Sequence, residues 1–299
     1  MYYNRDMRNV LFFTIYIIFF ALLSSLIFSL LYMQFDEQPM LALNKAIKYG
    51  AILLCAIFIV PTIKAKNLYD KKLLGYLESK NIFLLNILKG FFLSIILSSP
   101  LLFILVNFDI RNINLDFILF DQFVLYTILL TFFISLIIST IEESFFRGIM
   151  IQDNRNNIVT FIIIMLSSIV YSLFHFIKIP LIIDDNIFWY TGIKELLNVF
   201  VNFNNLVSLD AAVTLFAFGV LLGIIRNNYK TISHCIGIHA GFIFVIKIFR
   251  QNSSVNFESH YNFLISRYDH FTGYLSTSWI TIILLTYIIY LYKKNSNPF

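Results

Sequence analysis

Two adjacent glutamates, Glu142 and Glu143, stand after a long and mostly apolar stretch, and Arg147 follows within one helical turn. Charged side chains in such a stretch are costly at membrane depth and usually mark function. At about 100° per residue, Glu143 and Arg147 share a helix face and can pair, whereas Glu142 points elsewhere. The spacing therefore predicts one ion-paired glutamate, Glu143, and one free carboxylate, Glu142, that is suited to act as a base.

His175 lies in a second apolar stretch, preceded at helical spacing by Ser168, Tyr171 and Ser172. On a continuous helix these residues form one polar stripe, which predicts that the stripe faces other helices. Small polar residues also hold membrane helices together without any catalytic role. The stripe therefore fits either a site or a packing surface, and the histidine favours a site.

His239 lies in a third apolar stretch. His234 stands five residues earlier, which places it about 140° away around a helix. We expect His234 to be an interfacial histidine and His239 to belong to the site. A carboxylate (Glu142) and two imidazoles (His175 and His239) can activate a water and stabilise an oxyanion. The same three side chains could instead hold a divalent metal such as zinc, with one position open for water.

The composition indicates a polytopic membrane protein, because 59% of the 299 residues are hydrophobic, 13% are charged and the mean hydropathy is +0.80. Soluble domains carry about 25% charged residues. We expect an all-α fold forming a single integral-membrane domain over residues 1–299. Its eight spans, each long enough for a hydrocarbon core of roughly 30 Å, are expected near 9–33, 47–64, 86–107, 117–141, 158–178, 208–226, 231–249 and 274–292.

The distribution of Lys and Arg between the loops predicts that both termini are cytoplasmic. Lys89 interrupts the third span, so residues 80–90 could instead be interfacial, and Ile193–Phe203 is expected to form an amphipathic helix on the membrane surface. No dense basic cluster is present, so we expect a lipid bilayer and no nucleic acid as partner. A composition rich in Ile, Asn and Lys is typical of an AT-rich bacterial genome and favours a bacterial inner membrane.

Three motifs, in this order and spacing, resemble the CPBP (CAAX protease and bacteriocin-processing, or Abi) family, which includes the type II CAAX prenyl endopeptidases. The motifs are Glu142-Glu143-x-x-x-Arg147, Tyr171-x-x-x-His175 and a third that begins at His239. The resemblance covers roughly residues 135–245, which we expect to be the catalytic core of the domain.

The resemblance implies an intramembrane endopeptidase that hydrolyses a peptide bond of a membrane-associated protein or peptide. It implies that Glu142 activates the water. It also implies that Glu143 and Arg147 support the site. His175 and His239 would position the water or bind a metal, and a metal-free mechanism is equally consistent with the family.

Two positions depart from the family pattern, because Tyr171 replaces the usual phenylalanine and Ile243 replaces an asparagine or similar polar residue. An apolar side chain cannot donate a hydrogen bond to an oxyanion, and losing such a donor costs about 3 kcal/mol. Ile243 therefore keeps a second hypothesis open, a catalytically inactive scaffold or immunity protein of the same fold. A third hypothesis is a small-solute or proton-coupled transporter, although the half-repeats typical of transporters are not visible in the sequence.

Overall fold

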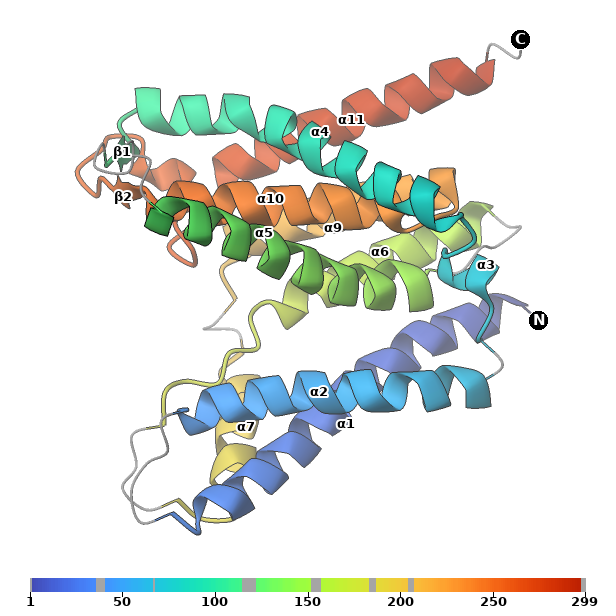
Figure 1. Ribbon diagram of the computed structural model, residues 1–299, viewed down its shortest axis with the longest axis vertical. Coiled ribbons are helices and arrows are strands. Elements are labelled where there is room, and N and C mark those ends of the chain that lie inside the picture. The colour runs from blue at the N-terminus through green and yellow to red at the C-terminus, as the bar shows by residue number, and fades with distance from the viewer. Residues whose placement is uncertain are drawn as a thin grey trace. The chain divides into compact units, whose positions relative to one another are not determined.

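The computed structural model describes residues 2–35, 41–66, 68–114, 122–151, 157–182, 187–203 and 207–296. Within these residues eight helices are long and apolar enough to cross a membrane, so the predicted all-α fold with eight spans is confirmed. The helices are α1 (Tyr2–Tyr32), α2 (Leu43–Ala65), α4 (Lys80–Asn107), α5 (Gln122–Glu143), α6 (Asn157–Phe174), α9 (Leu209–Tyr229), α10 (Ser233–Gln251) and α11 (Tyr274–Ser296) (Figure 1). The cytoplasmic placement of both termini stays a prediction.

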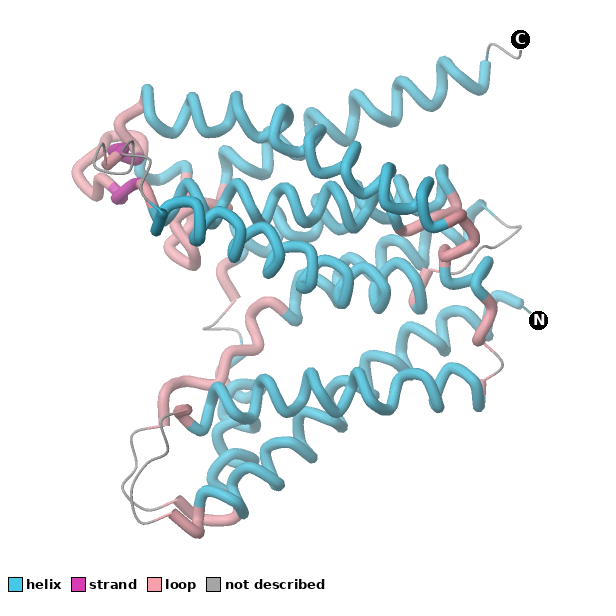
Figure 2. Tube along the Cα trace, in the orientation of Figure 1, coloured by secondary structure: helices cyan, strands magenta, loops and turns pink. Residues whose placement is uncertain are grey.

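Few other elements accompany these helices in the described part of the chain (Figure 2). They are the short helices α3 (Lys71–Leu74) and α7 (Thr191–Val201), a π-helical turn (Ser144–Ile149), a 3-10 turn (Asn262–Leu264), and the antiparallel strands β1 (Arg111–Ile113) and β2 (Ser253–Val255). Helix α4 runs without interruption from Lys80, and an interfacial position for residues 80–90 stays a prediction. The first residues of the predicted fourth span, 117–121, lie outside the described residues.

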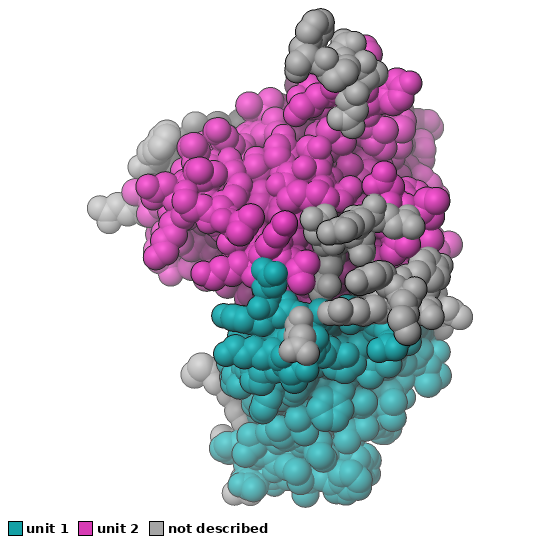
Figure 3. All heavy atoms as spheres, turned by 90° about the vertical axis from the view of Figure 1, so that its right-hand side faces the viewer, with its two compact units in different colours: residues 1–70, 172–207 teal, residues 71–171, 208–299 magenta. Residues whose placement is uncertain are grey.

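The helices form two compact units (Figure 3). The first unit comprises residues 1–70 and 172–207, and the second comprises residues 71–171 and 208–299. The last residues of α6, from Ser172 onward, are thus counted with the first unit. The expectation of a single domain over the whole chain stays a prediction.

In the first unit, helices α1, α2 and α7 pack on one another through small polar residues. The Ser24 hydroxyl donates to the carbonyl of Ile47 at 2.7 Å, and the backbone N–H of Gly192 donates to Ser29 Oγ at 2.9 Å. The predicted helix near Ile193–Phe203 is present as α7, and it buries Leu196 and Val199. Its position on a membrane surface stays a prediction.

In the second unit, α10 contacts α4, α5 and α9. Glycines allow this close approach, because a Cβ atom at Gly237 would overlap the carbonyl oxygen of Ile87, and one at Gly241 would overlap Ser94 Oγ. Without side chains at these positions the backbone of α10 lies directly against that of α4. This packing fixes α10, and therefore His239, against the helices that surround it.

Candidate active site

The fourth span changes its helical geometry directly after the two glutamates. Helix α5 ends at Glu143 and continues as a π-helical turn, Ser144–Ile149, in which the backbone N–H of Met150 donates to the carbonyl of Phe145 at 3.1 Å. Such wide turns are rare in proteins, and those that do occur are frequently found at functional sites. Arg147 lies inside this turn and is buried there.

Glu143 and Arg147 form a buried ion pair, as their spacing predicts. Arg147 Nε lies 3.3 Å from Glu143 Oε2, and the two side chains are 1% and 0% exposed. The guanidinium also donates through Nη2 to the carbonyl of Gly219 in α9 at 3.3 Å, and it lies over the ring of Tyr171, 4.6 Å from the ring centre. Arg147 thereby links α5, α6 and α9 around one carboxylate.

The other oxygen of Glu143 holds His239. Oε1 of Glu143 lies 2.8 Å from Nδ1 of His239, and an ionised carboxylate only accepts hydrogen bonds. Nδ1–H is therefore the donor, which fixes the orientation of the ring and leaves Nε2 of the neutral imidazole as an acceptor. Glu143 thus acts on the site through His239.

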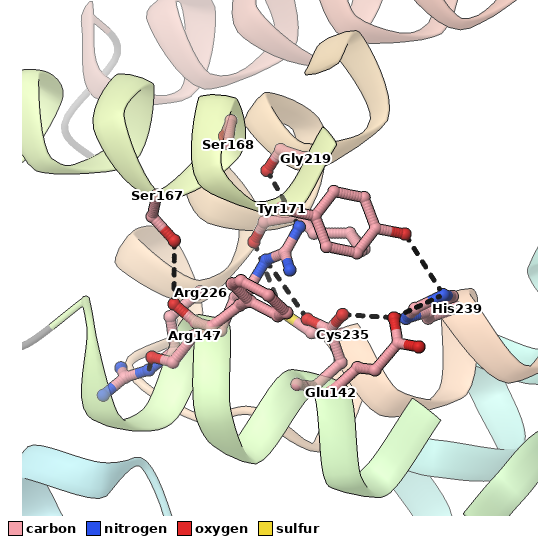
Figure 4. Close-up of polar contacts among 12 residues, drawn as sticks. Glu142, Arg147, Ser167, Ser168, Tyr171, Gly219, Arg226, Cys235 and His239 are labelled. Carbon is pink, nitrogen blue, oxygen red and sulfur yellow. Dashed lines mark hydrogen bonds and ion pairs between the residues drawn. The ribbon is translucent and has the colours of Figure 1, made fainter. Parts of the chain in front are cut away.

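Glu142 approaches the opposite side of the same ring (Figure 4). Its Oε2 lies 3.9 Å from Nε2 of His239, which is beyond hydrogen-bond range. Oε2 is buried, and no group in the described residues donates a hydrogen bond to it, although the side chain as a whole is 30% exposed. Buried carboxylate oxygens require a donor, so Glu142 Oε2 is suited to bind a water beside Nε2.

The Tyr171 hydroxyl is a second oxygen that approaches Nε2 of His239, at 3.4 Å (Figure 4). Nε2 is therefore the point at which side chains from α5, α6 and α10 converge. Sequence reasoning identified Tyr171 as the aromatic residue of a motif and did not assign its hydroxyl to the site.

The helical stripe that includes His175 ends earlier than predicted. Helix α6 stops at Phe174, and the backbone N–H of His175 donates to the carbonyl of Ser172, three residues back, at 3.2 Å. The next two amides repeat this tighter spacing, so the helix is finished before Pro180, whose ring and missing N–H exclude a regular helix there. His175 is counted with the first unit, whereas Glu142 and His239 lie in the second unit, where the structure brings them together.

The donor set does not match a catalytic zinc site, which normally has three protein ligands. Glu142 and His239 Nε2 supply two, whereas both oxygens of Glu143 already serve His239 and Arg147. Among the described residues, no group of three or more His, Cys, Asp or Glu side chains is placed to hold a metal ion. His175 belongs to the other unit, so the predicted metal set of Glu142, His175 and His239 stays a prediction.

Arg226 supports the site from α9 and was missed by sequence reasoning. It is 1% exposed; its Nε donates to the carbonyl of Arg147 at 3.2 Å, and its Nη2 donates to the carbonyl of Leu73 at 2.9 Å. This side chain ties the π-helical turn to α3. In the sequence Arg226 is the last residue of the predicted span 208–226, where a basic residue is typical of the membrane boundary, so its burial gave no signal.

Tyr76 lies in the segment that follows α3 and makes a second link to the π-helical turn. Its hydroxyl lies 2.5 Å from Ser144 Oγ, and Ser144 itself donates to the carbonyl of Thr140, so Tyr76 is the donor. Burial raises the pKa of the Tyr76 phenol, which keeps it protonated and able to donate. The π-helical turn is thus anchored at Ser144 and at Arg147.

Comparison with known proteins supports the resemblance seen in the motifs. The family model described as type II CAAX prenyl endopeptidase Rce1-like matches residues 123–245, an interval that includes Glu142, Glu143, His175 and His239. The match begins slightly before the expected core of residues 135–245. No curated protein and no solved structure matches the chain. Segment 123–245 of this eight-span membrane protein is thus similar to the Rce1-like type II CAAX prenyl endopeptidases.

Proposed function

We propose that this chain is an intramembrane endopeptidase that hydrolyses a peptide bond of a membrane-associated protein or peptide. The observation that carries the proposal is a continuous series of contacts, which runs from Glu142 to His239, from His239 to Glu143 and from Glu143 to Arg147. Glu142 Oε2, to which no described group donates a hydrogen bond, lies near Nε2 of the imidazole, and Glu143 holds the other ring nitrogen. The family match supports the class of reaction.

In this mechanism Glu142 is the general base. It takes a proton from a water molecule as the water oxygen bonds to the carbonyl carbon, and the π electrons of the carbonyl move onto its oxygen. Nε2 of His239 accepts the second hydrogen of the water and so orients the attack. When the C–N bond breaks, the proton passes from Glu142 to the leaving nitrogen, which yields one carboxylic acid and one amine.

Glu143 and Arg147 are positioning residues in this scheme. Glu143 holds Nδ1–H of His239, and Arg147 neutralises the Glu143 carboxylate, so neither side chain has to touch the substrate. We propose a metal-free reaction, because the described side chains that meet at Nε2 supply too few ligands for a catalytic metal. His175 is left without an assigned step.

The test compares wild type with Glu142→Gln and with Glu258→Gln. Glu258 is an exposed carboxylate in the loop after β2 and serves as the matched control. Each form is expressed in cells, and new peptide termini in the membrane fraction are identified by mass spectrometry. We expect termini that appear with wild type and with Glu258→Gln and are missing with Glu142→Gln, because an amide cannot accept the proton of water.

Identical termini from wild type and Glu142→Gln would remove the basis for proteolysis. In that case a scaffold of the same fold would explain the family match better than an enzyme. Both variants must reach the membrane at wild-type abundance, which immunoblotting of the same fractions measures.

A further inference from the structure

Tyr171 places a buried hydroxyl group in the last turn of α6. The side chain is 1% exposed, and its Oη lies 3.4 Å from Nε2 of His239. Two neighbours hold the ring in place. The guanidinium of Arg147 lies 4.6 Å from the ring centre, and Phe146 packs edge-on with the ring centres 5.3 Å apart. The direction of the hydroxyl is thus fixed toward the place where Glu142 and His239 meet (Figure 4).

The contact between Tyr171 and His239 is a weak one. Because Nδ1–H of His239 donates to Glu143, Nε2 accepts and the phenol is the donor. A separation of 3.4 Å is well beyond the usual length of about 2.8 Å for a hydrogen bond from a hydroxyl. Such a bond is easily exchanged for a closer and more negative acceptor.

The position on α10 one turn after His239 offers no donor of its own. Ile243 follows His239 by four residues and lies on the same helix face. An aliphatic side chain cannot stabilise negative charge on a substrate oxygen. A hydroxyl from α6 that points at the same nitrogen is placed to do so.

We propose that the Tyr171 hydroxyl is the hydrogen-bond donor to the oxyanion that forms on the scissile carbonyl, an inference that rests on the proposed function. The attacking water donates to Nε2 of His239 and replaces the long contact from Tyr171. The phenol keeps its proton and donates a hydrogen bond to the carbonyl oxygen as negative charge develops there. When the C–N bond breaks and the C=O double bond returns, this hydrogen bond weakens, and Tyr171 has neither gained nor lost a proton.

The buried surroundings make this donor effective. A hydrogen bond in a water-excluded site is stronger than the same bond in water, and it requires no reorganisation when the donor is already oriented. Tyr171 meets both conditions, since its ring packs against Phe146 and Arg147 of the π-helical turn and its side chain is buried.

The test is Tyr171→Phe, which keeps the ring, its contact with Arg147 and the packing on Phe146. Tyr126→Phe is the matched control, because Tyr126 is exposed on α5. The probe is a fluorophore–quencher peptide spanning the cleavage site identified by comparing wild type with Glu142→Gln. We expect kcat in proteoliposomes to fall by about 10²–10³-fold in Tyr171→Phe, the usual loss for one oxyanion donor. KM should change little, because the bond forms only in the transition state.

Two results would overturn the inference while leaving the proposed function intact. One is a Tyr171→Phe enzyme whose kcat matches that of Tyr126→Phe while Glu142→Gln is inactive. The other is a displaced pH profile of kcat/KM with an unchanged limiting rate, which would show that the hydroxyl only tunes His239. A loss that is uniform across the pH range supports the oxyanion role. Cleavage of the probe by Glu142→Gln would instead refute the proposed function itself.

Discussion

Removing Arg147 should expose the energetic cost of the buried carboxylate beside it. In Arg147→Met, Glu143 would remain at 0% exposure with His239 Nδ1 as its remaining described donor. Breaking a buried ion pair by removing one partner costs about 3–5 kcal/mol, because the other charge stays buried and uncompensated. We therefore expect the free energy of unfolding to fall by about that amount.

The double variant Glu143→Gln/Arg147→Met should be more stable than Arg147→Met alone. The glutamine oxygen can still accept Nδ1–H of His239, and no buried charge is left. What the double variant still lacks is the bond to Gly219, worth about 1 kcal/mol, and the contact with the Tyr171 ring, worth about 1 kcal/mol. The difference between the two variants should be about 2 kcal/mol in favour of the double variant.

Equilibrium unfolding in bicelles, followed by far-ultraviolet circular dichroism, measures these differences. Lys89→Met, at an exposed cation of α4, is the control for loss of a charge without a buried partner and should be near neutral. If the costs of Glu143→Gln and Arg147→Met simply add in the double variant, the two side chains are not coupled and the reasoning is refuted.

Three further outcomes follow from the same structure. Arg226→Met should lower the free energy of unfolding by about 1–3 kcal/mol, because the carbonyls of Arg147 and Leu73 lose their buried donor, and limited proteolysis near α3 should speed up; unchanged proteolysis would contradict this. Gly237→Ala should cost about 1–3 kcal/mol, since the new methyl group would overlap the carbonyl of Ile87, and a thermal unfolding midpoint equal to wild type would disprove the close contact. EDTA and 1,10-phenanthroline should leave the rate of peptide cleavage unchanged, whereas a loss that added zinc restores would show that a metal takes part.

Local sequence determined the features that depend on chain length and helical periodicity. Runs of apolar residues long enough for a bilayer gave eight spans, because a helix rises a fixed distance per residue. The pairing of Glu143 with Arg147 followed from their separation by four residues, which brings two side chains together within one turn. The separation of Glu142 from that pair had the same origin.

Tertiary packing decided everything that joins one helix to another. Glycines such as Gly237 bring α10 against α4, and only this packing sets the direction in which His239 meets Glu143. The burial of Arg226 and the aim of the Tyr171 hydroxyl also depend on neighbouring helices that are distant in the chain. The periodicity of a single helix predicts which residues share a face. It does not predict which helix packs against that face, because interhelical contacts depend on the shapes of both partners.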